Sequence, residues 1–382
     1  INWSNHLRLT FNLQNSSLYV LFGENQIEHG YEFFGSALQY IHTPSSERLI
    51  VNTCNSLFNN NFPLLVGSNG IRRKQLLTYI AANFGNFIYF ASSFPDYSFN
   101  IISRLFTGAA LSGCWLCFVN IQNQTHSNLS FIYEMLRNFS STLNSGGIRM
   151  NINSKIIEIK NTCRFLMTSD SCFLENNDTE IPPQLRSLLK PIACSAPDLR
   201  LIAEIKLISF GFKSTKHFSV KITSLLSTIS ESYEYLHCKE QMKLLTHLLE
   251  NARDYLRQLM HSKGVSFVNY YESARTAEEY AITRSFYEEF IHNVKEEHIE
   301  SFFELLYSTF HVFDTFETFK NNLLNSNFFA DEIASSLIRE EVSKFTSNEY
   351  YINQTIILFK LLMNYSCIII CGESYSGKSY IV

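Results

Sequence analysis

One stretch near the end of the chain carries a complete pattern for phosphate chemistry. In such a loop the backbone N–H groups surround the phosphates of a nucleotide, the lysine reaches the β- and γ-phosphates, and the serine hydroxyl ligates Mg²⁺. The stretch is therefore the candidate site for ATP, with Ser379 as the candidate Mg²⁺ ligand. A chance match in a turn of serine and glycine is the alternative. The residues that fit G-x-x-x-x-G-K-[ST] at every fixed position are Gly372, Glu373, Ser374, Tyr375, Ser376, Gly377, Lys378 and Ser379.

An earlier turn, also expected to follow a strand, keeps only part of the same pattern. Gly67 stands at the first fixed glycine, but Arg72 stands at the second, Arg73 at the lysine and Lys74 at the serine or threonine. A bulky side chain is poorly suited to a turn that wraps closely around phosphate, and a lysine cannot ligate Mg²⁺. Gly67, Gly70, Arg73 and Lys74 are therefore the poorer phosphate-binding candidates, and a plain strand–turn–helix connection is the alternative.

The strand that should carry the carboxylates of an ATPase lacks them. It is predicted at Cys114–Phe118, and Val119 and Asn120 follow it. Neither residue offers a carboxylate to hold Mg²⁺ or to take a proton from the attacking water. Cys114 and Cys117 form a C-x-x-C pair inside this strand, but no second pair stands at metal-binding spacing, so core cysteines are favoured over a zinc or redox site.

The elements that must position these turns predict an α/β fold. Alternation of strands with helices of about 10–15 residues favours a mostly parallel sheet covered on both faces. Thr43 is the predicted N-cap of the first helix, with Pro44 at its first position. A hairpin is predicted over residues 148–159, the pattern is helical from Leu199 onward, and a last buried strand is predicted at Cys367–Cys371. The alternating strands are expected at 18–22, 62–66, 87–90, 114–119 and 163–168.

Composition limits the class of protein. A length of 382 residues favours about two or three domains, and 46% apolar against 17% charged residues excludes a disordered chain. The net charge of −4 and the lack of a basic run argue against nucleic-acid and membrane-surface partners. Nine scattered cysteines favour a reducing compartment. Because the sequence starts without Met and stops inside a motif, we expect a fragment of a longer protein.

Several further segments resemble motifs of the cytoplasmic and axonemal dynein heavy chains, and they occur in the same order along the chain as in that family. The similarity runs from the end of the linker, through the first AAA+ module, to the P-loop of the second. Each segment is moderately specific, and together they are highly specific. They are Trp3–Leu9, His29–Gly35, Thr43–Pro44, Ser103–Gly108, Ser112–Phe118, Ile181–Arg186, Lys190–Ala193, Pro197–Glu204 and Ser209–Phe212.

The resemblance implies a domain layout and a fold class. Residues 1–30 correspond to the end of the linker, 31–195 to the large α/β subdomain of an AAA+ P-loop module, and 196–258 to its helical small subdomain. Residues 259–382 correspond to the helices and P-loop of a truncated second module. The departures from the family fall on catalytic positions: besides Val119 and Asn120, Ser169 stands at the sensor asparagine and Cys238 at the sensor arginine.

The resemblance also implies a function. It implies an ATP- and Mg²⁺-binding segment of the motor ring, working in microtubule-based movement, in which the first hydrolytic site is impaired, so no catalytic residue is expected to be intact. Implied partners are dynein intermediate and light intermediate chains, and microtubules through regions outside this chain, in the cytoplasm and cytoskeleton. A non-motor, dynein-like scaffold is the alternative, and an unrelated P-loop ATPase matched by accident is a third.

Overall fold

The computed structural model describes most of the chain up to residue 325 and short pieces after it. The described ranges are 6–35, 40–68, 70–92, 97–152, 155–170, 182–232, 241–262, 270–291, 294, 298–310 and 315–325, followed by 340, 355, 358–359, 362, 367–371, 374 and 378–381. The chain divides into two compact units, Ile1–Asn251 and Ala252–Val382.

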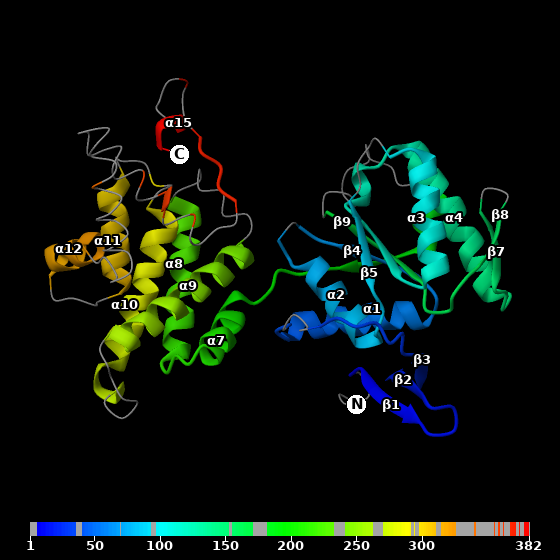
Figure 1. Cartoon of the computed structure of the whole chain (residues 1–382), viewed down its shortest axis with the longest axis horizontal. Coiled ribbons are helices and arrows are strands. Elements are labelled where there is room, and N and C mark those ends of the chain that lie inside the picture. The colour runs from blue at the N-terminus through cyan, green and yellow to red at the C-terminus, as the bar shows by residue number, and fades with distance from the viewer. Residues whose placement is uncertain are drawn as a thin grey trace. The chain divides into compact units, whose positions relative to one another are not determined.

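The first unit is built on a parallel sheet of five strands (Figure 1). The alternating sequence pattern predicted a parallel sheet and four of these strands, but not β10, and the strand predicted at 18–22 lies in a separate antiparallel sheet. The strand order is β10-β4-β9-β6-β5, and every neighbouring pair is parallel. Parallel strands need a crossover connection, which helices supply here. The α/β fold class is therefore confirmed. The strands are β4 (Phe62–Val66), β5 (Ile88–Ser92), β6 (Trp115–Val119), β9 (Arg164–Ser169) and β10 (Leu189–Ala193).

Helices cover both faces of this sheet, which explains why its central strands are apolar throughout. On one face Phe62 of β4 packs against Phe139 of α4, with ring centres 6.3 Å apart. On the other face Trp115 of β6 packs against Phe84 of α2 at 5.3 Å. The first face carries α3 (Phe99–Ser112) and α4 (His126–Asn144), and the second carries α1 (Pro44–Phe58) and α2 (Arg73–Phe84).

Local signals in the sequence explain two of the smaller features. The Thr43 side chain accepts a hydrogen bond from the N–H of Ser46 at the start of α1, in a capping box, so the predicted N-cap is confirmed. The predicted hairpin forms as β7 (Arg149–Ile152) and β8 (Lys155–Glu158), which pair antiparallel. The short helices η2 (Ile121–Asn123, a 3₁₀ turn) and α6 (Pro183–Leu188) complete this part of the unit.

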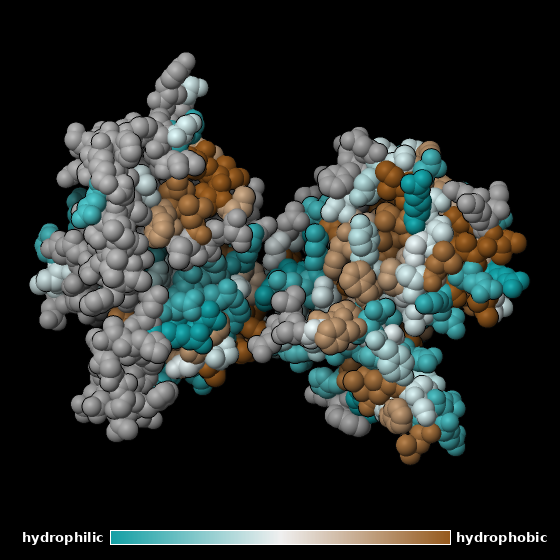
Figure 2. All heavy atoms as spheres, viewed as in Figure 1, coloured by the Kyte–Doolittle hydropathy of each residue, from teal (hydrophilic) through white to brown (hydrophobic). Residues whose placement is uncertain are grey.

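A small antiparallel sheet precedes the parallel one. It comprises β1 (Arg8–Asn12), β2 (Ser17–Phe22) and β3 (Asn25–Glu28), of which only a strand at 18–22 was predicted. Its β2 strand buries Val20 and Phe22 against α1 and α2. Figure 2 shows apolar side chains at the surface around β1, where Leu9 and Phe11 are exposed.

The segment His29–Glu32 fastens the small sheet to the end of α2. The Gly30 N–H donates to the Phe84 carbonyl at 2.9 Å, and the Glu32 N–H donates to the Gly85 carbonyl at 2.8 Å. Gly85 ends α2 in the left-handed conformation, with φ +67°, and a Cβ there would lie 2.1 Å from the His29 ring. The absence of a side chain at Gly85 is what permits this contact.

The remaining described elements are helical. They are α7 (Leu199–Ser209), α8 (Thr215–Ser232), α9 (Gln241–Ser262), α10 (Tyr270–Phe290), α11 (Ile299–Thr309), α12 (Phe316–Asn325) and α15 (Lys378–Ile381). In the second unit, aromatic side chains form the core: Phe286 packs 6.3 Å from Phe310, and Tyr307 packs 5.4 Å from Phe319. Among the helices of the described ranges, none combines the length and apolarity needed to cross a bilayer.

The predicted strand at Cys367–Cys371 is wrong. The structure describes these five residues and assigns them to no strand, and four of the five are exposed. No described strand pairs with them. A strand is stabilised by ladder hydrogen bonds to a neighbour, so an apolar run without such a neighbour does not form one.

Candidate nucleotide site

The carboxyl ends of β4, β6 and β9 lie at one edge of the parallel sheet. The register places Val66 of β4 beside Ser169 of β9, and Phe118 of β6 beside Met167 of β9. The turn after β4, the residues after β6 and the end of β9 therefore meet, and Gly67, Asn120 and Ser169 come from these three places. This edge is where ligands bind in open α/β sheets.

The turn after β4 is held tightly to its neighbours. The Gly67 N–H donates to the Ser169 carbonyl at 3.0 Å. A Cβ at Gly67 would lie 2.9 Å from both the Cβ and the carbonyl oxygen of Cys194, which explains why glycine is kept here. Arg72, at the position of the missing glycine, adopts φ 62° and ψ 28°, a left-handed conformation that glycine accepts more readily.

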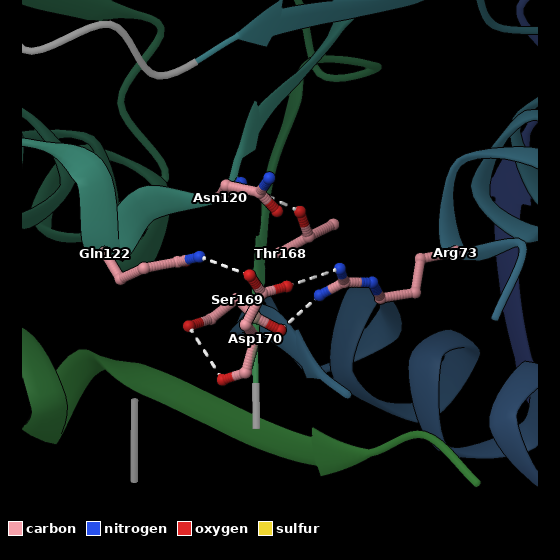
Figure 3. Close-up of polar contacts among 6 residues, drawn as sticks. All are labelled: Arg73, Asn120, Gln122, Thr168, Ser169 and Asp170. Atoms are coloured by element: carbon pink, nitrogen blue, oxygen red, sulfur yellow. Dashed lines mark hydrogen bonds and ion pairs between the residues drawn. The ribbon is translucent and has the colours of Figure 1, made fainter. Parts of the chain in front are cut away.

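Arg73, at the lysine position of the pattern, is directed into the protein. It is the first residue of α2, and its side chain is only 8% exposed. Its guanidinium donates to the Ser169 carbonyl and forms an ion pair with Asp170, 3.0 Å between Nη2 and Oδ1 (Figure 3). Lys74, by contrast, is exposed. The cation expected to meet a phosphate thus contacts the end of β9 instead.

Asp170 also binds a third element. Its other carboxylate oxygen, Oδ2, accepts a hydrogen bond from Gln122 Nε2 at 3.0 Å (Figure 3). Gln122 lies in η2, directly after β6. Asp170 therefore joins the turn after β4 to the turn after β6. Sequence reasoning missed both residues, although an acid directly after a buried strand, at the edge where a basic turn also ends, was a usable signal.

Asn120 directly follows β6. Its backbone is left-handed, with φ 55° and ψ 58°, and its N–H donates to Thr168 Oγ1 at 3.1 Å. Its side-chain oxygen is buried without a hydrogen-bond partner among the described residues. Val119 is 8% exposed and packs toward α1 and α2.

These residues do not fit a Mg²⁺ ion. Mg²⁺ requires oxygen ligands in near-octahedral geometry and is held in such sites by carboxylates and a hydroxyl. Here Val119 is apolar, Lys74 replaces the hydroxyl, and Asp170 is engaged by Arg73 and Gln122. These side chains therefore do not support a metal-dependent hydrolytic step at this site.

Of the predicted core pair, Cys117 is buried, whereas Cys114 is only partly buried, as is Cys194. Burial raises the pKa of the Cys117 thiol to about 12, although Lys74 and Arg73 oppose the shift, and raises the pKa of Cys194 to about 11. Neutral thiols are poor metal ligands. Within the described ranges, no group of three or more His, Cys, Asp or Glu side chains is arranged to hold a metal.

The complete phosphate loop is described only in part. Ser374 lies in an exposed turn, and Lys378 begins α15, where Ser379 is exposed. Gly372, Glu373, Tyr375, Ser376 and Gly377 lie outside the described residues, as does Cys238. The assignment of these positions therefore stays a prediction.

Comparison with known proteins agrees with this architecture. The family model described as the hydrolytic ATP binding site of the dynein motor region matches residues 29–379, which is most of the chain. The chain belongs to the dynein motor-region family. The resemblance stated from the sequence motifs is confirmed.

Relatives of this dynein family come from both axonemal and cytoplasmic classes. The chain is 23% identical to "Dynein axonemal heavy chain 2" of Mus musculus over 252 residues, which is 66% of this chain and 6% of that protein. It is 22% identical to "Dynein heavy chain, cytoplasmic" of Paramecium tetraurelia over 263 residues, 68% of this chain and 6% of that protein. A Caenorhabditis elegans cytoplasmic heavy chain is 20% identical over 76% of this chain. The chain therefore spans about 6% of the length of these relatives.

Proposed function

We propose that this chain is a segment of a dynein motor ring that holds ATP at its second phosphate loop and does not hydrolyse ATP at its first site. The observation that carries the proposal is a contrast between two loops. The loop at 372–379 keeps every fixed residue of the phosphate pattern, whereas the turn at 67–74 has lost its second glycine, lysine and hydroxyl. Family membership supports the ATP-binding role.

At the second loop, Lys378 and Ser379 are the residues proposed to act on the nucleotide. Lys378 is the first residue of α15, where helical N–H groups favour an anion, and its ammonium group binds the β- and γ-phosphates. The Ser379 hydroxyl, which is exposed, is of the chemical type that ligates Mg²⁺. When bound, Mg²⁺ neutralises charge on the phosphates.

The domain layout inferred from the motifs is part of the proposal. Residues 1–30 form the end of the linker, 31–195 the large subdomain of the first AAA+ module, 196–258 its small subdomain, and 259–382 the start of the second module. The parallel sheet within the second range and the helices α7 to α9 in the third support this division.

The work of the whole protein is proposed from its relatives. Their names support a role in the cytoskeleton, as a cytoplasmic or axonemal dynein that moves along microtubules. Microtubule contact would lie in regions outside these residues, and intermediate and light intermediate chains are the expected partners. The second candidate is a non-motor scaffold of the same family, favoured by the loss of carboxylates at Val119 and Asn120. The sequence of the longest gene product distinguishes a motor from a scaffold, because a motor needs a microtubule-binding tip and further intact phosphate loops.

The test of the ATP assignment is nucleotide binding by that longest gene product, with any other intact phosphate loop disabled at its lysine. Lys378→Ala should weaken ATP binding by about 10-fold or more, because it removes a charge-assisted hydrogen bond. Lys74→Ala, which changes an exposed lysine at the first site, is the matched control and should leave affinity unchanged. Equal affinities for wild type and Lys378→Ala would refute the assignment.

A further inference from the structure

The described part of the first site contains an anion of its own. Asp170 follows β9 directly, and its carboxylate lies at the sheet edge where the turn after β4 ends. One oxygen pairs with Arg73 at 3.0 Å and the other accepts from Gln122 at 3.0 Å (Figure 3). Three elements of the site, from β4, β6 and β9, are thereby joined by one side chain.

We propose that Asp170 is an internal anion that takes the place of a bound phosphate at the first site. The Arg73–Asp170–Gln122 cluster then holds the three catalytic elements of an ATPase module together without any nucleotide. The inference rests on the proposed function in one respect, namely that residues 67–74 correspond to a phosphate-binding turn. It goes further, because it states what occupies that turn.

The start of α2 carries a concentration of positive charge. Arg72, Arg73 and Lys74 stand at its N-terminus, and no acidic residue lies in its first turn. The N-terminal end of a helix carries partial positive charge, so cations there are unfavourable and an anion is favourable. In an intact phosphate-binding loop, a bound phosphate supplies this anion. Here the carboxylate of Asp170 supplies the negative charge, from a residue 97 positions away in the sequence.

Hydrogen bonds within the protein hold both ends of the turn after β4. The Ser169 carbonyl accepts both the Gly67 N–H, at 3.0 Å, and the Arg73 guanidinium. The two ends of the turn thus share one acceptor, the carbonyl of Ser169, and Ser169 is fully buried. A phosphate entering the turn would have to displace bonds that the protein already makes.

Asp170 competes with a phosphate for the Arg73 guanidinium. Asp170 is 27% exposed and Arg73 is 8% exposed, so the pair is partly removed from water and is screened less than a surface pair. A carboxylate beside the guanidinium repels an incoming phosphate, and a buried cation separated from its partner is costly. The Asp170 carboxylate therefore excludes the phosphate that the basic turn would otherwise attract.

The test is anion rescue of the 382-residue chain, carried out with Lys378→Ala in every variant to disable the second loop. Melting temperature is measured in chloride, inorganic phosphate and pyrophosphate at equal ionic strength. Asp170→Ala should lower the melting temperature in chloride by about 4 °C or more. Phosphate and pyrophosphate should restore much of that loss, because the vacated position again attracts an anion.

Three comparisons make the result decisive. The matched control is Glu158→Ala, which disrupts the Arg149–Glu158 pair, whose side chains are 73% and 69% exposed. Pyrophosphate should raise the melting temperature of the chain with intact Arg73 and Asp170 no more than it raises that of this control. Arg73→Met combined with Asp170→Ala should not be rescued. Asp170→Asn, a milder change, provides the same comparison should Asp170→Ala fail to fold.

Other outcomes would overturn the proposal. These are no stability loss on removing the Asp170 carboxylate, a loss that neither anion restores, rescue that persists without Arg73, or stabilisation by pyrophosphate with the intact pair. None of them bears on ATP binding through Lys378, which is measured separately, so failure here is distinguishable from failure of the proposed function.

Discussion

Arg73 and Asp170 form an ion pair of 3.0 Å that links the first turn of α2 to the end of β9. Arg73 is the first residue of α2, and Asp170 directly follows the last residue of β9. The contact joins the turn after β4 directly to the carboxyl end of β9.

The left-handed backbone of Arg72 predicts a stabilising substitution. Arg72 has φ 62° where the pattern has glycine, and a residue with a Cβ is strained there. Arg72→Gly should raise the free energy of unfolding by about 0.5–1 kcal/mol relative to Arg72→Ala. Both variants lack the Arg72 side chain, so the comparison isolates the backbone contribution. Urea denaturation measures it, and a Gly variant less stable than the Ala variant would contradict the prediction.

The close approach of the His29 ring to Gly85 predicts a contrast between two glycines. Gly85 and Gly146 share φ +67°, but a Cβ at Gly85 would meet His29 at 2.1 Å, whereas nothing lies within 4 Å of one at Gly146. Gly85→Ala should therefore be more destabilising than Gly146→Ala by about 1–3 kcal/mol, as expected for overpacking.

The difference between the two glycine variants should shrink when His29→Ala is added, because the smaller side chain leaves room for the new methyl group. Thermal or urea denaturation of the four variants measures the difference. Equal losses at Gly85 and Gly146 would show that the contact does not constrain the end of α2.

His29 also predicts a pH dependence. Burial lowers the pKa of His29 below its ordinary value of 6.5, and its Nδ1 accepts a hydrogen bond from the Tyr31 N–H at 3.1 Å, which requires that nitrogen to be unprotonated. The unfolded state therefore binds more protons, and stability rises with pH. The contribution is present above pH 6.5 and is lost as pH falls through that value toward the lower folded pKa.

The measurement for His29 is the free energy of unfolding as a function of pH. His29→Gln should flatten the part of the profile near and below pH 6.5. A wild-type profile that is unchanged by His29→Gln would remove this assignment.

In the second unit, Arg284 predicts a large loss of stability. Its side chain is 4% exposed, its Nε donates to Glu288 Oε1 at 2.7 Å, and its Nη1 donates to the Leu323 carbonyl of α12. Arg284→Met would leave a partly buried carboxylate without this cation, so the unit should lose about 2–4 kcal/mol. Arg149→Met, at an exposed pair, should change stability by less than about 1 kcal/mol. Hydrogen exchange of α10 reports the loss for Arg284→Met and that of β7 reports the loss for Arg149→Met, and similar losses for the two variants would contradict the prediction.

The parts of the fold that depend on local patterns could be predicted from the sequence. Thr43 and Pro44 mark the start of α1 because capping acts within one turn of a helix, and the apolar runs of β4 and β6 mark strands buried on both faces. The strand at Cys367–Cys371 was wrong because an apolar run forms a strand only where a neighbouring strand pairs with it, and no described strand pairs with these residues.

The cluster at the first site could not be predicted in the same way. Gly67, Arg73, Asn120 and Ser169 were singled out by their spacing in a motif. The pairing of Arg73 with Asp170 depends on the register between β4 and β9, which no local pattern encodes. The strands β1, β3 and β10 were also missed, since short, half-exposed strands carry little periodic signal.

The most direct test of this account is phosphate release from ATP by the longest gene product that contains these 382 residues. Lys378→Ala disables the second loop, and the lysine of any further intact phosphate loop is changed in the same way. We expect no steady turnover, because Val119 and Asn120 offer neither a metal-binding carboxylate nor a base, and Arg73 is held by Asp170. Turnover of roughly one per second or more, within the ordinary range of enzymes, that disappears with Arg73→Met would show a working first site and contradict the account.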